Sequence, residues 1–205
     1  MTTPSRPKER LLALLKKQSV FHGDFVLSSG ARSNVYVDCK LTTLDPTGAC
    51  LAGEVMFSLI RDYAKEHGLK LDAVGGLTMG ADPLALAIGI ESVRSEHGPR
   101  LQVFSVRKSP KAHGQNKLIE GNFQPGNRVV VLDDVITRGE STLKAIEAVE
   151  QSGGHVDLVV ALVDREEGGR QKIVERRYPV LSVFGRKEVF ERESADAPKG
   201  SVAIA

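Results

Sequence analysis

The fold of this chain is decided by the stretch Val129-Val-Val-Leu-Asp133-Asp134-Val-Ile-Thr137-Arg-Gly139-Glu-Ser141-Thr142. It opens with four apolar residues, three of them β-branched, a run too short for a helix. We therefore expect a buried parallel strand with two carboxylates directly at its end. From Ser141 to Gln151, apolar and small residues recur at helical spacing, which predicts an amphipathic helix. The predicted order is strand, acidic pair, tight loop and helix.

The loop after the acidic pair has the composition of a phosphate site. In an open α/β sheet, ligands bind beyond the carboxyl ends of the strands. Gly139 permits a close backbone approach, and the loop N–H groups can hold a phosphate with the hydroxyls of Thr137, Ser141 and Thr142. The carboxylates would repel an anion, so we expect them to bind sugar hydroxyls or to hold a metal through water. The alternative is an ordinary strand–helix turn in which Asp134 only caps the backbone.

Val129 to Ser141 resembles the phosphoribosyl diphosphate (PRPP) binding motif of the type I phosphoribosyltransferases, because both have four apolar residues, two acids, two apolar residues and then Thr-x-Gly-x-Ser. The resemblance implies an α/β fold with a mainly parallel central sheet flanked by helices and a small N-terminal hood. It implies catalysis by Asp134, and Mg²⁺ held mainly through PRPP near the two carboxylates. The PRPP-binding residues that it implies here are Asp133, Asp134, Val135, Ile136, Thr137, Arg138, Gly139, Glu140 and Ser141.

Near the N-terminus, an amphipathic helix over Lys8 to Gln18 is predicted to precede two short strands, Phe21 to Leu27 and Asn34 to Cys39. The loop between them and the start of the second strand, Ser29-Gly-Ala-Arg-Ser-Asn-Val-Tyr36, partly resemble the N-terminal signature of the orotate phosphoribosyltransferases. In that family this region helps to cover the base, which places Arg32 and Tyr36 on orotate. An ordinary polar hairpin with a solvated arginine is the alternative.

A strand over Leu101 to Val106 is predicted to run into a basic segment, residues 107–117. The segment resembles the Arg-Lys-x-x-Lys-x-His loop that closes over the diphosphate in orotate phosphoribosyltransferases, often over the neighbouring subunit's site. The resemblance implies PRPP binding by Arg107, Lys108, Lys111 and His113, and catalysis by Lys111 and His113. A solvated basic run is the alternative. RNA binding is disfavoured because no aromatic residue is interleaved for base stacking.

Two further turns follow predicted strands. His155 to Val163 ends at Asp164-Arg165, and in the family this arginine contacts orotate, whose carboxylate suits a guanidinium fork. Thr137 is assigned to orotate as well. A loop salt bridge to Asp164 or Glu166 is the alternative for the arginine. Leu71 to Gly75 precedes a glycine-rich turn that can receive the diphosphate, although the family's aromatic residue and lysine are replaced there by Met79 and Gly80. The glycines can alternatively serve only to pack helix on sheet.

The rest of the chain is interpreted as scaffold. We expect a long helix from Thr47 to His67, a helix to about Arg94 after the glycine-rich turn, and a helix over Arg170 to Arg177. A strand over Val180 to Phe184 is followed by a short charged piece. These elements form one domain, with the hood over about residues 1–45, the core over about 46–193 and a loose tail over 194–205.

Composition limits the function classes. With 205 residues, 41% of them hydrophobic and 26% charged, the chain can bury a sizeable core. A net charge of +2 gives no general reason to expect nucleic-acid binding. Cys39 and Cys50 cannot form a disulfide framework, and no signal peptide or membrane span is apparent, so we expect a cytoplasmic protein without a membrane partner.

The resemblance implies an enzyme that transfers the 5-phosphoribosyl group from PRPP to orotate, with Mg²⁺, in de novo pyrimidine (UMP) biosynthesis. The products are orotidine 5′-monophosphate and diphosphate. A homodimer is implied, with the 107–117 segment reaching the neighbouring site. Two rivals remain: a phosphoribosyltransferase for a purine or another base, and a non-catalytic PRPP sensor that regulates transcription or binds RNA.

Overall fold

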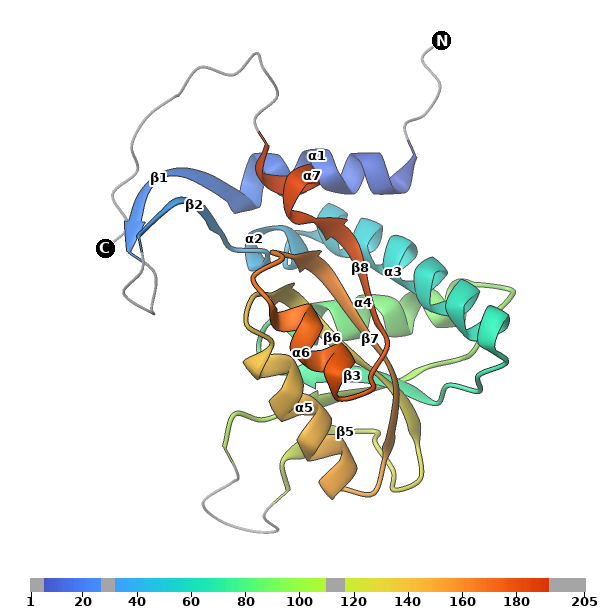
Figure 1. Cartoon of the computed structure of the whole chain (residues 1–205). Helices are drawn as coiled ribbons and strands as arrows, with labels where there is room; N and C mark the ends of the chain where they lie inside the picture. Colours follow the sequence, from blue (N-terminus) through green and yellow to red (C-terminus); the bar gives the residue numbers. More distant parts are fainter. Residues whose placement is uncertain (1–5, 27–31, 110–116, 192–205) are drawn as a thin grey trace.

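The computed structural model describes residues 6–26, 32–109 and 117–191, and Figure 1 follows the chain through them. In chain order the elements are α1 (Pro7–Ser19), β1 (Val20–Val26), β2 (Arg32–Val37), α2 (Lys40–Thr43), α3 (Pro46–His67), β3 (Ala73–Leu77), α4 (Ala81–Arg94), β4 (Gln102–Val106), β5 (Ile119–Gly121), β6 (Arg128–Ile136), α5 (Glu140–Gln151), β7 (His155–Asp164), α6 (Gly169–Glu175), β8 (Val180–Gly185) and α7 (Arg186–Phe190). After α3 strands and helices mostly alternate, as the sequence predicted, except that β4, β5 and β6 follow one another without a helix between them.

Six strands form the central sheet in the order β5-β4-β3-β6-β7-β8. All neighbouring pairs are parallel except β4 and β5, which run antiparallel. The stretch that opens at Val129 is β6, in the interior of the sheet between β3 and β7, which confirms the predicted parallel strand. The strand is longer than expected, however, because its pairing with β7 continues to Ile136 opposite Asp164. The two carboxylates therefore lie within the last part of β6 and not beyond it.

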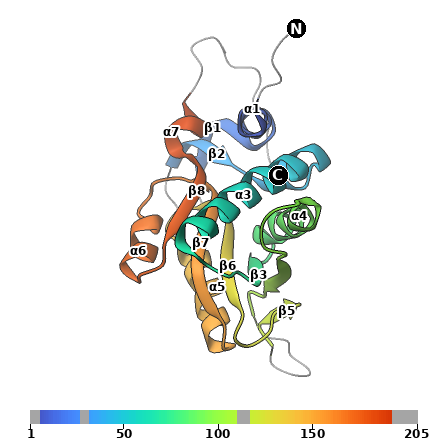
Figure 2. The same ribbon diagram turned by 90° about the vertical axis from the view of Figure 1, so that its right-hand side faces the viewer.

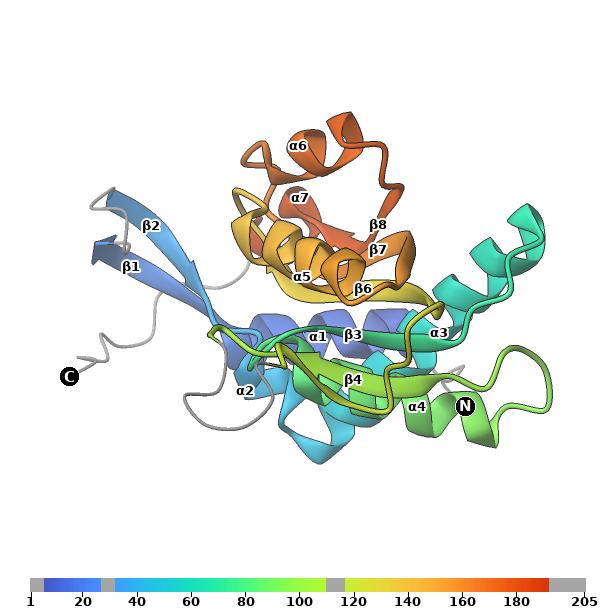
Figure 3. The same ribbon diagram turned by 90° about the horizontal axis from the view of Figure 1, so that it is seen from below.

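Helices cover both faces of the sheet (Figures 2 and 3): α1, α3 and α4 lie on one face, and α5 and α6 on the other. The side chains of β6 alternate between these two layers. Val130 and Leu132 belong to the core cluster that contains α3 and α4 residues, whereas Val129 and Val131 belong to the cluster beneath α5. Because successive side chains of a strand point to opposite faces, the same alternation sends Asp133 toward α5 and Asp134 toward α4.

The N-terminal hairpin, β1 and β2, forms a separate antiparallel sheet that projects beside the central one (Figure 3). Tyr36 packs between Phe21 and Phe25, with ring centroids 6.2 and 5.6 Å away. A buried hydrogen bond of 2.7 Å between the hydroxyls of Ser19 and Thr42 joins the end of α1 to α2 and so fixes the base of the hairpin. Both predicted strands are confirmed, with their bounds shifted by one or two residues.

Three predictions of local structure need correction. The strand expected to end at Gly75 is β3 and runs to Leu77, so Gly75 and Gly76 lie inside it. A Cβ atom would lie 2.2 Å from the carbonyl oxygen of Phe104 at Gly75 and 2.1 Å from that of Leu132 at Gly76, so these glycines allow close strand packing. The charged piece after β8 begins with a short helix, α7, and the short strand β5 was not predicted.

Candidate active site

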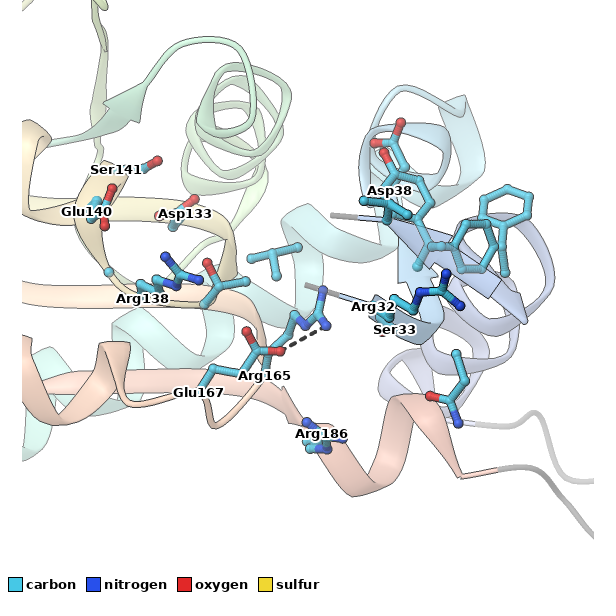
Figure 4. Close-up of a pocket in the computed structure, with 18 of the residues that line it drawn as sticks. Arg32, Ser33, Asp38, Asp133, Arg138, Glu140, Ser141, Arg165, Glu167 and Arg186 are labelled. Carbon is cyan, nitrogen blue, oxygen red and sulfur yellow. Dashed lines mark ion pairs between the residues drawn. The ribbon is translucent and has the colours of Figure 1, made fainter. Parts of the chain in front are cut away.

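A cleft of about 1370 Å³ opens between the N-terminal hairpin, the carboxyl ends of β6 and β7, and the start of α7 (Figure 4). Ligands bind at this edge of an α/β sheet because the loops there supply polar groups. Residues from all the predicted base and ribose-phosphate regions line this one cleft: Arg32, Tyr36, Asp133, Val135, Thr137, Arg138, Gly139, Glu140, Ser141 and Arg165. The fold thus brings together side chains that are more than 100 residues apart in the sequence.

Other predicted residues lie elsewhere. Ile136 is fully buried in the core, so only its backbone is available to a ligand, and its carbonyl accepts the N–H of Arg165 at 2.9 Å. Arg107 and Lys108 follow β4 and do not line the cleft; the Arg107 guanidinium pairs with Glu120 at 3.6 Å. Lys111 and His113 lie outside the described residues, as does the segment from 27 to 31 that carries part of the hairpin signature.

The phosphate loop, residues Thr137–Gly139, depends on a second glycine-containing turn. Gly139 has a φ of +77° and precedes the first turn of α5, a conformation that favours glycine. Gly169 donates its N–H to the Thr137 carbonyl at 2.9 Å, and a Cβ atom on Gly169 would lie only 2.5 Å from that oxygen. The phosphate loop therefore rests directly on the backbone of the Gly168-Gly169 turn. Sequence reasoning missed this support, although the glycine pair is the visible signal of it.

Asp133 is 8% exposed and accepts a hydrogen bond of 2.6 Å from the Thr142 hydroxyl. Burial, with a smaller contribution from the neighbouring Asp134 carboxylate, raises the pKa of Asp133 to about 7, although the Thr142 hydrogen bond acts in the opposite direction. The expectation that Thr142 contacts a phosphate is wrong here, because its hydroxyl is buried and bonded to Asp133. Asp133 is therefore partly protonated near neutral pH.

Asp134 is half-buried on the opposite face of β6, toward the start of α4. Its Oδ1 accepts the N–H of Val135 at 3.0 Å, and a Cβ atom on Gly80 would lie 2.4 Å from the same oxygen. A glycine at this position therefore leaves room for Asp134. The nearby ammonium of Lys40 lies 2.6 Å from an Asp38 carboxylate oxygen, and hydrogen bonding to Asp38, with a smaller contribution from Asp134, raises the pKa of Lys40.

Arg165 is the first residue after β7, and its side chain is 11% exposed. Its Nη2 lies 2.8 Å from Oε1 of Glu167, an ion pair drawn as a dashed line in Figure 4. The guanidinium carbon lies 5.6 Å from the ring centroid of Phe190 in α7. Arg165 therefore forms a salt bridge on the loop, but with Glu167 and not with Asp164 or Glu166 as considered from the sequence, and it lines the cleft at the same time.

The turn between β3 and α4, Thr78 to Gly80, is tied to the neighbouring strand through Asp82. One carboxylate oxygen of Asp82 accepts the Thr78 hydroxyl at 2.6 Å and the other accepts the Ser105 hydroxyl at 2.7 Å. These bonds hold the turn in place without any lysine, the residue that the family resemblance led us to look for here. Met79 at its tip is 61% exposed.

Direct metal ligation by several protein groups finds no support in the described part of the chain, where no cluster of three or more His, Cys, Asp or Glu side chains could hold an ion. Of the helices in the same residues, none is both long and apolar enough to cross a membrane. A cytoplasmic location stays a prediction from the sequence.

Comparison with known proteins gives a consistent result. No family model matches the chain. An orotate phosphoribosyltransferase of Aquifex aeolicus is 44% identical over 186 residues, which cover 89% of this chain and 97% of the relative. The crystal structure of Mycobacterium tuberculosis orotate phosphoribosyltransferase with Fe(III) dicitrate is similar with a TM-score of 0.77 and 37% identity, over 91% of this chain and 100% of that one. The same enzyme in complex with PRPP has a TM-score of 0.72 and 34% identity, over 90% and 99% of the two chains. With relatives this similar over nearly its whole length, the chain belongs to the orotate phosphoribosyltransferase family of type I phosphoribosyltransferases.

Proposed function

We propose that the cleft transfers the 5-phosphoribosyl group of PRPP to orotate, giving orotidine 5′-monophosphate and diphosphate for de novo pyrimidine biosynthesis. One observation carries the assignment of this reaction to the cleft. The phosphate loop, Asp133, Arg165 and Tyr36 come from three separate parts of the chain and line a single cavity. A phosphate site, a diol site and a cationic, aromatic base site are the three parts that this pair of substrates requires.

The 5-phosphate binds at the start of α5. The N–H groups in the first turn of a helix have no partners within the helix, and the helix dipole favours an anion there. The hydroxyls of Thr137 and Ser141 add neutral donors, and both residues line the cleft. Arg138 lines it as well and supplies a positive charge beside the same loop.

The ribose binds beside β6, with Asp133 facing its hydroxyls and Asp134 on the opposite face of the strand. Hard carboxylate oxygens fit Mg²⁺. Asp134 is the better ligand of the two because it is less buried and does not accept the Thr142 hydroxyl, which is bound to Asp133. The remaining ligands come from PRPP, and the bound ion supplies charge neutralisation to the diphosphate.

The chemical step is displacement at the anomeric carbon with oxocarbenium character in the transition state, by analogy with other glycosyl transfers. The protein holds both substrates in line and stabilises the negative charge that develops on the departing diphosphate. Lys111 and His113 contribute to this stabilisation, with Arg107 and Lys108 at the start of the same segment. No covalent intermediate with the protein is required.

Orotate binds between the hairpin and the end of β7. Tyr36 is held by Phe21 and Phe25, which gives the cleft an aromatic wall on the side of the base. Arg32 lines the cavity from the hairpin, and Arg165 lines it from the sheet; both are labelled in Figure 4. Their guanidinium groups match the carboxylate of orotate, with Thr137 as an additional polar contact.

A second copy of the chain covers α4 in a homodimer. Leu86, Ile90 and Val93 are 58%, 45% and 61% exposed, and their spacing places them on one side of the helix. Such an apolar stripe is typical of an interface between protein chains. In this dimer the 107–117 segment of one protomer acts at the neighbouring site.

The function is tested by following orotate absorbance after purified protein is mixed with PRPP and orotate, with and without Mg²⁺. Parallel reactions contain hypoxanthine, adenine or uracil. We expect Mg²⁺-dependent consumption of orotate alone. Turnover of a purine instead would transfer the assignment to another base, and PRPP binding without turnover of any base would favour the sensor.

A further inference from the structure

Arg186 is a cationic residue of the cleft that no sequence motif singled out. It is the first residue of α7 and lines the same cavity as Arg165 and Arg32. Its side chain is exposed, and within the described part of the chain its guanidinium makes no ion pair or hydrogen bond. Figure 4 shows Arg186 at the start of α7, below Arg165 in this view.

The pairing of two strands places these arginines next to each other. Asp164 at the end of β7 lies opposite Gly185 at the end of β8, so the residues that follow, Arg165 and Arg186, leave neighbouring strands at the same edge of the sheet. The lack of a side chain at Gly185 lets Glu166 in the adjacent turn come close, because a Cβ atom on Gly185 would lie 2.9 Å from a carboxylate oxygen of Glu166. The Gly185 N–H donates a hydrogen bond of 3.0 Å to the Glu188 carboxylate, and this bond holds the start of α7 in place.

Arg165 alone is a poor receptor for a second carboxylate. One of its terminal nitrogens already binds Glu167, and that carboxylate also lines the cleft, so the pair carries no net charge. An anionic base approaching the pair is attracted by one charge and repelled by the other. Arg186 removes this balance on the sheet side of the cleft, because Arg165 and Arg186 together outweigh the one carboxylate of Glu167 and add to the positive charge that Arg32 supplies from the hairpin.

We propose that Arg186 is a second ligand of the orotate carboxylate, acting with Arg165 and favouring a base that carries a carboxylate over uracil, which lacks one. This assignment rests on the proposed transfer to orotate. It gives the base side of the cleft a specificity-determining residue from α7, an element outside the PRPP motif and the hairpin.

The test compares Arg186→Gln with Lys187→Gln, a matched loss of one positive charge at the next position, which is exposed and does not line the cleft. Loss of a charge-assisted hydrogen bond is expected to raise the KM for orotate about 10- to 100-fold in Arg186→Gln. The KM for PRPP and the thermal unfolding temperature should stay near wild-type values. Arg186→Lys should recover only part of the orotate affinity, because an ammonium cannot form the bidentate fork.

The outcomes separate this inference from the function on which it rests. Wild-type protein that does not turn over orotate would refute the proposed function itself. Active wild-type protein with an unchanged KM for orotate in Arg186→Gln, or an equal rise in Lys187→Gln, would overturn the role of Arg186 alone. A parallel rise in the KM for PRPP would also overturn it, because that result would indicate a general change in the cleft.

Discussion

Replacing Asp133 by asparagine should make the ligand-free protein more stable and the enzyme weaker. Asp133 is 8% exposed, and burial raises its pKa from 3.8 to about 7. Above that pH the folded protein must hold a buried charge that costs free energy. Asparagine resembles the protonated acid in shape, because its oxygen can still accept the Thr142 hydroxyl and its amide can donate to Asp134. The substitution therefore removes the cost of ionisation while it keeps the local hydrogen bonds.

The size of the effect follows from the pKa shift. A carboxyl group whose pKa is raised on folding makes the folded protein less stable as the pH rises from the group's unfolded pKa to its folded pKa. Each pKa unit corresponds to about 1.4 kcal/mol. The shift from 3.8 to about 7 therefore lowers the free energy of unfolding by at most about 4 kcal/mol at pH 8. At pH 5 only about a third of that cost is present. The stability gained by Asp133→Asn should therefore be about 3 kcal/mol larger at pH 8 than at pH 5.

Urea unfolding of both proteins at several pH values between 5 and 8 measures this difference, provided that the m-values agree. Asp62→Asn is a suitable control, because the Asp62 side chain is 64% exposed and its pair with Arg61 contributes at most about 1 kcal/mol. In the same experiment PRPP with Mg²⁺ should stabilise the wild type more than Asp133→Asn, and kcat/KM for PRPP should fall at least about tenfold. A stability difference between the two proteins that does not change with pH would refute the argument that burial of this charge is costly.

Five further predictions concern other parts of the site and the proposed dimer surface. Lys111→Ala should lower kcat by about 100-fold or more in steady-state assays, as expected for the loss of a transition-state donor, and a wild-type rate would remove this residue from the mechanism. If the basic segment acts across the dimer, mixing Lys111→Ala with Arg165→Ala protomers should restore some activity, whereas verified heterodimers without recovery would mean that it acts within its own protomer. Asp134→Asn should shift the Mg²⁺ dependence of turnover to higher concentration, and an unchanged titration with unchanged PRPP affinity would contradict its assignment. Gly169→Ala places a Cβ 2.5 Å from a carbonyl oxygen of the phosphate loop and should raise the KM for PRPP about tenfold or more, so an unaltered KM would show that the loop does not depend on this support. If the protein is the dimer proposed above, Ile90→Glu should sediment as a monomer, and a variant that stays dimeric would place the interface elsewhere.

Local patterns were sufficient for the main elements of the fold. A run of β-branched residues, followed by a glycine-containing loop and a helical periodicity, predicts β6 and α5. A strand buried on both faces and a helix buried on one face each require a pattern of apolar residues that are close together in the sequence. The boundaries were less accurate. The apolar pair Val135-Ile136 indicates that β6 continues past the acidic pair. The strand expected from the sequence ended before the carboxylates, and it therefore did not predict that Asp133 and Asp134 point in opposite directions.

The sequence by itself determined the α/β fold, the position of the phosphate loop after β6 and the family to which the chain is similar, because each of these depends on residues close together in the chain. Only the tertiary structure decided that Gly169 supports the phosphate loop, that Asp82 ties the β3–α4 turn to β4, and that Arg186 stands beside Arg165. These contacts depend on which strands are neighbours and in which register they pair. That choice is made by packing of the whole sheet against its two helical layers, and no local spacing encodes it.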